Sequence, residues 1–108
     1  VMDINRDVLE DAFYEMSPHS DITLAESLVV VNPLMPIVTP IAVTDANYGS
    51  VPRYYIETTY DNAISPRIQR SMYTTMPCDE VFTIRSDHSP FFSRPFHLTW
   101  ILQRIANR

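Results

Sequence analysis

The feature that most limits how this chain can fold is a pair of strand-like runs separated by a helical segment. Tyr54 to Thr59 and Glu80 to Arg85 are rich in aromatic and β-branched residues, which is typical of strands. The segment between them opens with Ser65-Pro66, a cap residue followed by proline, and predicts a helix to about Met76. Ile68, Met72 and Tyr73 are expected to face inward on this helix. This alternation favours an α/β fold with parallel strands and helices packed on their faces.

A last helix is predicted from Arg94-Pro95 to Asn107, where apolar residues form a broad face. The second half of the chain therefore alternates strand, helix, strand and helix. Two parallel strands make a poor sheet, because parallel strands are covered on both faces and their edges need partners. We therefore expect Tyr54–Thr59 to dock onto strands that this chain does not contain.

The first half is predicted to be helical and then extended. Asp3 to Met16 and Pro18 to Leu28 each carry apolar residues at helical spacing. The segment from Asn32 to Pro40 holds three prolines, which argue against both a helix and a central strand. Its apolar side chains are expected to be buried, either as a connector or as one wall of a pocket. Thr44 to Tyr48 is predicted to form one helical turn.

Composition excludes several classes of site. The 108 residues include one glycine, Gly49, and nine prolines, so the chain cannot form a Gly-x-Ser-x-Gly nucleophile elbow or a glycine-rich phosphate loop. The net charge is −5 and all basic residues are interspersed arginines, which argues against nucleic acid as a partner. No apolar run is long enough to predict a membrane span. The single Cys78 excludes an internal disulfide and a cysteine-based metal site, and no cofactor is expected.

Two side chains of catalytic type follow the two predicted strands. Asp61 comes after the first strand and His88 after the second, in the acid-then-base order of a Ser…Asp…His triad. The alternatives are ordinary: Asp61 as a loop cap and His88 as a hydrogen-bonded loop histidine. Asp87 adjoins His88, and we interpret it as structural because adjacent side chains at a strand end point apart.

Three stretches resemble α/β-hydrolases of the methylesterase and hydroxynitrile-lyase-like branch. Arg53 to Gln69, with Thr58-x-x-Asp61-Asn62, resembles the acid-bearing strand and loop of that branch. Asp87 to Pro95 resembles its catalytic histidine loop. Ala12-Phe13-Tyr14, together with the segment from Pro33 to Pro40, resembles the end of its helical cap and the return to the sheet.

The resemblance implies the C-terminal portion of the α/β-hydrolase fold, completed by a partner chain. Residues 1–42 would be the end of the helical cap and the return connector, and residues 43–108 the last strand-helix-strand-helix part of the core. Asp61 would be the triad acid and His88 the general base. The partner would be an N-terminal chain that carries the nucleophilic serine in Gly-x-Ser-x-Gly and the oxyanion hole.

The implied activity is hydrolysis of a small hydrophobic or aromatic carboxylic ester. Lyase members of the branch carry a lysine after the histidine, whereas this chain has Ser89 there and no lysine anywhere. Lyase or other non-hydrolytic chemistry, or a non-catalytic interaction domain, are the alternatives. The compartment is left open, with the cytoplasm favoured. An apolar wall for the substrate, or else plain core packing, is predicted for Phe13, Leu24, Leu28, Leu34 and Met35.

Overall fold

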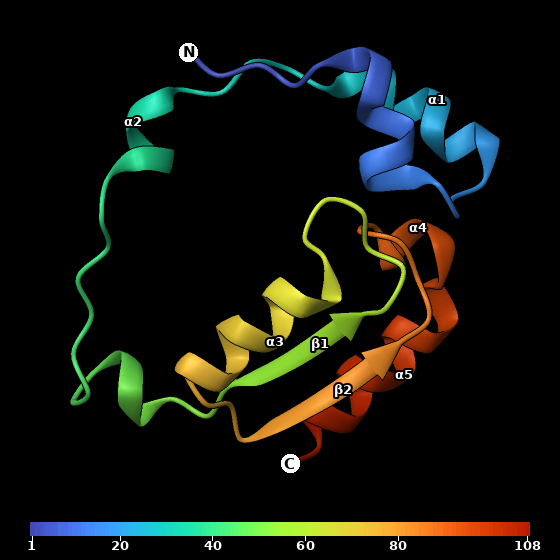
Figure 1. The fold of residues 1–108 in the computed structure, drawn as a ribbon. Coiled ribbons are helices and arrows are strands. Elements are labelled where there is room, and N and C mark those ends of the chain that lie inside the picture. The colour runs from blue at the N-terminus through green and yellow to red at the C-terminus, as the bar shows by residue number, and fades with distance from the viewer.

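A computed structural model describes residues 1–108, and its two halves differ in character (Figure 1). The C-terminal half is a small layered unit of strands and helices, and the N-terminal half is an arc that runs around one side of it. The principal extents are 41 × 35 × 23 Å. The helices are α1 (His19–Leu28), α2 (Leu34–Val38), α3 (Pro66–Thr75), α4 (Pro90–Ser93) and α5 (Pro95–Ala106), and the strands are β1 (Tyr54–Thr58) and β2 (Glu80–Ile84).

The two strands form a parallel sheet, as the sequence predicts. Their register pairs Tyr54 with Glu80 and Thr58 with Ile84. Helix α3 connects them and packs on β1, and α5 packs on β2 from the other side of the sheet (Figure 1). The carboxyl ends of both strands therefore lie side by side, and the loops that follow them meet there.

An ion pair between the buried Glu57 and the exposed Arg70 joins β1 to α3. The Glu57 side chain is buried and accepts hydrogen bonds from Arg70 at 2.7 Å and from the Tyr73 hydroxyl at 2.8 Å. The Arg70 hydrogen bond is the main reason that the pKa of Glu57 is lowered. Burial raises this pKa, but the hydrogen bonds from Arg70 and Tyr73 together outweigh it. The Tyr55 and Tyr73 rings, with centroids 5.1 Å apart and planes tilted by 53°, make a second contact between β1 and α3.

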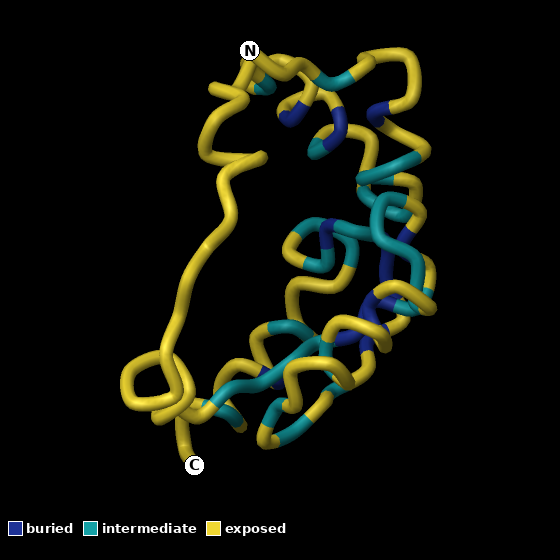
Figure 2. The backbone as a smooth tube through the Cα atoms, turned by 60° about the vertical axis from the view of Figure 1, so that its left-hand side comes forward, coloured by how far each residue is buried: buried dark blue, intermediate teal, exposed yellow.

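Few apolar side chains are buried. Leu9, Ile22 and Ala25 lie in the N-terminal helices, whereas Ile84 and Ile101 form the centre of the layered unit. Figure 2 shows the arc that connects the N-terminal helices to the layered unit exposed along its length. Seven polar residues are also buried, most of them beside the strand ends. The chain thus leaves much apolar surface uncovered.

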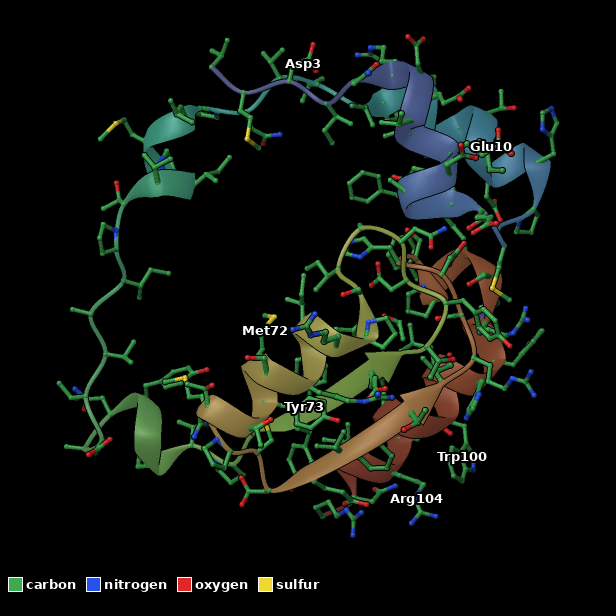
Figure 3. All side chains as sticks on the ribbon, viewed as in Figure 1. Asp3, Glu10, Met72, Tyr73, Trp100 and Arg104 are labelled. Carbon is green, nitrogen blue, oxygen red and sulfur yellow. The ribbon has the colours of Figure 1, made fainter.

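Several predicted inward-facing residues are exposed, contrary to the sequence-based expectation. Ile68 and Met72 on α3 are half exposed, and Met35 on α2 is 67% exposed. Figure 3 places Met72 and Tyr73 on different sides of α3, and Tyr73 is the one that reaches β1. The apolar pattern predicted burial correctly only where this chain itself supplies the covering surface.

The predictions for the first half need two corrections. The expected helix from Asp3 to Met16 is a 3-10 turn (Arg6–Val8) followed by a π-helix (Glu10–Tyr14). The expected extended run from Asn32 to Pro40 contains α2. Its Pro36 is tolerated because the first four N–H groups of a helix need no intrahelical acceptor.

Two further local differences concern short turns. The turn expected over Thr44–Tyr48 forms a 3-10 turn slightly later (Tyr48–Ser50). Helix α4, which was not predicted, begins at Pro90 after Ser89, with the same serine-proline start as α3. None of the helices combines the length and the apolar character needed to cross a bilayer.

Candidate active site

The structure brings Asp61 and His88 together at the carboxyl ends of the two strands. The Asp61 Oδ2 and His88 Nδ1 atoms are 2.9 Å apart, a hydrogen-bond distance. Each residue lies in the loop that follows its strand, so the parallel pairing of β1 and β2 sets their separation. The two side chains that the sequence singles out as acid and base are therefore hydrogen-bonded neighbours.

Asp61 is buried and accepts hydrogen bonds on both carboxylate oxygens. Oδ1 accepts from the backbone N–H groups of Ala63 at 2.9 Å and Ile64 at 2.8 Å. Oδ2 accepts from the Thr58 hydroxyl at 2.8 Å as well as from His88. Burial raises the pKa of the Asp61 carboxyl, but the hydrogen bonds from Ile64, His88 and Thr58 outweigh it, and the pKa is lowered. Asp61 is therefore ionised at neutral pH.

The ionised acid determines which nitrogen of His88 carries the proton. Since Asp61 Oδ2 has no proton to give, the Nδ1–H of His88 donates to it, and in the neutral form of the ring Nε2 is left with a lone pair. Nε2 makes no hydrogen bond within the chain, and the side chain is 32% exposed. The ring packs edge-on against Phe13, with centroids 5.1 Å apart. A cavity of about 240 Å³ adjoins Asp61 and His88.

Gln69 connects the acid to the strand that carries it. Its Oε1 accepts from the Thr58 N–H at 2.9 Å and its Nε2 donates to the Thr58 carbonyl at 3.0 Å. The same Nε2 donates to the Ile64 carbonyl and lies 3.4 Å from Asp61 Oδ2. The side-chain amide thus pairs with Thr58 as a peptide group of a neighbouring strand would. The sequence pattern contained Gln69 but gave it no role.

Solved structures share the fold of this chain. Tomato methylketone synthase I in complex with 2-tridecanone superimposes with a TM-score of 0.83 at 31% identity, over 96% of this chain and 42% of that one. A methylesterase from Arabidopsis superimposes with a TM-score of 0.85 at 26% identity, over 97% of this chain and 46% of that one. The matched region is the C-terminal part of the α/β-hydrolase fold.

Sequence comparison matches the chain to the same C-terminal part of related proteins. Methylesterase 3 of Arabidopsis thaliana is 38% identical over 98 residues, which are 88% of this chain and 37% of the relative. The chain spans 24–38% of the length of the curated relatives it matches, and no family model matches it.

The chain has the fold of the C-terminal part of an α/β-hydrolase.

Of the five residues expected to form an apolar wall in this hydrolase segment, only Phe13 lies beside the Asp61–His88 pair. Leu24 and Leu28 are exposed on α1, at 50% and 66%, and Leu34 and Met35 are exposed on α2. None of the four lines a cavity, and the structure does not bring them together with His88.

Asp87 makes no hydrogen bond to the adjacent His88 and has partners of its own. The Asp87 side chain is fully buried, and its carboxylate accepts hydrogen bonds from two residues before α1 and two residues of the histidine loop. The donors to Asp87 are Met16 N, Ser17 Oγ, Ser89 N and Ser93 Oγ, at 2.8–3.0 Å.

No group of three or more histidine, cysteine, aspartate or glutamate side chains is placed to hold a metal ion.

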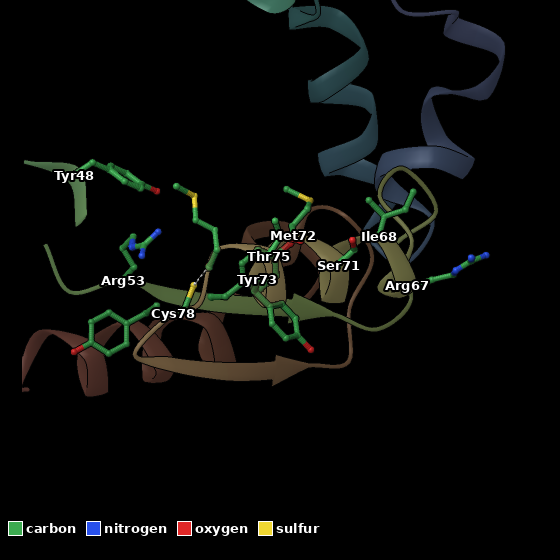
Figure 4. Close-up of a pocket in the computed structure, with 12 residues that line it drawn as sticks. Tyr48, Arg53, Arg67, Ile68, Ser71, Met72, Tyr73, Thr75 and Cys78 are labelled. Atoms are coloured by element: carbon green, nitrogen blue, oxygen red, sulfur yellow. Dashed lines mark hydrogen bonds between the residues drawn. The ribbon is translucent and has the colours of Figure 1, made fainter. Parts of the chain in front are cut away.

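The largest cavity of the hydrolase segment lies away from Asp61 and His88. It is a groove of about 870 Å³ between α3, the start of β1 and Tyr48 (Figure 4). Its lining is mostly apolar, with Ile68 and Met72 on one side, and it includes Arg53 and the free thiol of Cys78. This groove borders the edge of β1 that β2 does not cover.

Proposed function

We propose that this chain supplies the acid and the base of a Ser-His-Asp triad in an esterase-like α/β-hydrolase that acts on a small carboxylic ester. The observation that supports the proposal is the 2.9 Å hydrogen bond between Asp61 and His88. In this mechanism His88 Nε2 takes the proton of the serine as it attacks the ester carbonyl, and later returns it to the leaving alcohol.

Asp61 has two tasks in the proposed mechanism. Its hydrogen bond to Nδ1–H holds His88 in the tautomer whose Nε2 can accept a proton. Its negative charge then stabilises the imidazolium that forms during attack. Because the pKa of Asp61 is lowered, the carboxylate stays ionised while His88 gains and loses its proton.

The nucleophile and the oxyanion hole belong, in this proposal, to an N-terminal hydrolase part outside this chain. The only glycine is Gly49, so no Gly-x-Ser-x-Gly elbow is present among the 108 residues. Ser89 and Ser93 lie at the two ends of α4 in the histidine loop, and the Ser93 hydroxyl donates to Asp87. Neither serine lies on a strand-to-helix elbow. The incomplete coverage of the solved relatives, 42% and 46% of their length, supports the same division.

The free edge of β1 is the place where we expect this N-terminal part to attach. The Thr59 N–H donates to the Ile84 carbonyl, and the Arg53 carbonyl accepts from Asp79, so these residues face β2. Since successive residues of a strand alternate in direction, the peptide groups of Tyr54 and Ile56 face the open edge. The apolar groove beside α3 lies along this edge.

The acyl or alcohol part of the ester is expected to be apolar. Phe13 packs on the His88 ring and offers an apolar contact next to the proposed reacting atoms. The other four proposed wall residues, which are exposed here, would line a pocket once the N-terminal part covers them. They are Leu24, Leu28, Leu34 and Met35.

Non-hydrolytic chemistry on the same fold is the second candidate. It is favoured by the similarity to tomato methylketone synthase I, at 31% identity and a TM-score of 0.83. Product analysis separates the two candidates, since hydrolysis of an ester releases its acid and its alcohol in equal amounts. A third possibility, a non-catalytic interaction domain, requires that the biological activity survive His88→Ala.

The deciding experiment is to isolate the chain with the polypeptide it associates with and to assay that complex on short p-nitrophenyl esters. Native mass spectrometry should find a second polypeptide with a Gly-x-Ser-x-Gly motif. His88→Ala should abolish ester hydrolysis, whereas His97→Ala, at an exposed position on α5, should not change it. A lone 12.5 kDa species without esterase activity would refute the proposal.

A further inference from the structure

Asp87 is a buried charged residue that takes no part in the proposed proton transfer. Its side chain is 1% exposed, and no arginine or histidine pairs with it. A carboxyl group in such a place needs hydrogen-bond partners, because burial of a polar group without partners is very unfavourable. Its partners therefore show what the carboxylate holds together.

The four donors to Asp87 come from two segments about 70 residues apart in the sequence. Oδ2 accepts from the Met16 N–H at 2.9 Å and from the Ser17 hydroxyl at 3.0 Å. Oδ1 accepts from the Ser89 N–H at 3.0 Å and from the Ser93 hydroxyl at 2.8 Å. One oxygen thus binds the end of the first helical segment, and the other binds the histidine loop.

The same helical segment also contacts the loop of the acid. The Asn62 side chain donates to the Asp11 carbonyl at 3.0 Å and to the Glu15 carboxylate. Phe13, which lies between them in the π-helix, packs on the His88 ring at 5.1 Å. Residues 11–17 therefore touch both loops, and π-helices of this kind are frequent at functional sites.

We propose that Asp87 is a positioning residue that couples the seating of residues 11–17 to the orientation of His88. The His88 backbone lies between Asp87 and Ser89, both ends of one closed hydrogen-bonded turn. When residues 16 and 17 occupy their places, the Asp87 carboxylate and the turn are fixed, and the His88 ring meets Asp61. The inference rests on the proposed role of His88 as the base.

A merely structural role predicts something different. If Asp87 only stabilised the histidine loop, its contacts to Ser89 and Ser93 would be sufficient, and the loss of Ser17 would not affect His88. If it couples the two segments, removal of the Ser17 hydroxyl must change the state of the His88 ring. The two cases can therefore be distinguished by conservative serine substitutions.

The test uses the assembled hydrolase and compares Ser17→Ala with Ser20→Ala, an exposed serine of α1. The tautomer of His88 is measured from its ring ¹⁵N shifts by NMR, and kcat and KM are measured on the ester. We expect Ser17→Ala to reduce the Nδ1–H preference of His88 and to lower kcat about tenfold with little change in KM. Ser17→Thr, which keeps a hydroxyl, should restore both, and Ser20→Ala should change neither.

Three results would overturn the coupling. A Ser17→Ala protein with unchanged His88 tautomer and kcat is one. An effect that appears only in Ser93→Ala, on the loop side of the carboxylate, is the second. The third is a parent protein in which His88 shows no Nδ1–H preference. Because the NMR measurement needs no substrate, it separates failure of the coupling from failure of the proposed ester hydrolysis.

Discussion

Asp61 Oδ2 and His88 Nδ1 lie 2.9 Å apart although the two residues are 27 positions apart in the sequence. The separation is set by the parallel register of β1 and β2, in which Thr58 pairs with Ile84. Both loops begin at the carboxyl ends of the two neighbouring strands, so short loops are enough to bring the acid and the base together.

Asp61→Asn should inactivate the proposed enzyme without unfolding it. An amide at this position can donate to Nδ1 and favours the wrong tautomer of His88, so kcat should fall by roughly 10⁴ while KM changes little. Steady-state kinetics on the ester measure the effect. Asp45→Asn, at an exposed loop position, is the control and should retain full activity. Equal losses in both variants would contradict the role of Asp61.

Gln69→Ala should destabilise the end of β1. The substitution leaves the Thr58 N–H and carbonyl groups without their partners in a buried position, which costs on the order of 1–3 kcal/mol. Urea unfolding followed by circular dichroism gives the change in unfolding free energy. Gln103→Ala on the exposed side of α5 should change it by less than about 0.5 kcal/mol.

Stability should fall as the pH is lowered through the acidic range. Asp61 and Glu57 have folded-state pKa values below their usual values of 3.8 and 4.5. Between the folded and the usual pKa, the unfolded chain binds more protons, so the unfolding free energy rises with pH there. Their contribution is complete above the usual values and is lost as pH falls through the folded pKa values.

Denaturant unfolding between pH 2 and pH 6, a range of about four units around these carboxyl pKa values, tests this dependence. Each group contributes a slope of at most about 1.4 kcal/mol per pH unit. Glu57→Gln should remove its share of the slope, since glutamine does not titrate. A slope that is the same in the variant and the parent would show that other carboxyls dominate acid unfolding.

A charge in the groove beside α3 should prevent assembly with the N-terminal part. Met72 lines that groove and is 48% exposed in this chain, so Met72→Asp should leave the chain folded but place an unpaired carboxylate in the contact. Native mass spectrometry should show at least a tenfold loss of the complex. Thr99→Asp on α5 should assemble normally, and a Met72→Asp complex of full affinity would place the contact elsewhere.

The strand-helix-strand-helix order could be predicted from the sequence because local signals define it. Serine-proline and arginine-proline pairs mark the starts of α3 and α5, and aromatic and β-branched runs mark the strands. The approach of Asp61 to His88 follows from that order, since parallel strands end at one edge. Their catalytic roles stay a prediction that kinetics must test.

Other features depend on contacts between distant residues and could not be predicted. The Asp87 carboxylate binds Ser17, 70 residues earlier, and no local pattern announces such a contact. The π-helix from Glu10 to Tyr14 has the apolar spacing of an ordinary helix in sequence. Ile68 and Met72 carry a core-like pattern, but no side of this chain covers them and both are about half exposed.

The open edge of β1 also bears on how the chain behaves when it is produced alone. Unpaired peptide groups at Tyr54 and Ile56, beside an apolar groove, form a template for strands of other molecules. The Gln69 amide pairs with the N–H and carbonyl groups of Thr58 on this edge, so a strand of another molecule cannot pair with them at that end of β1. The other end has no such protection, so co-expression with the rest of the hydrolase should increase the soluble yield.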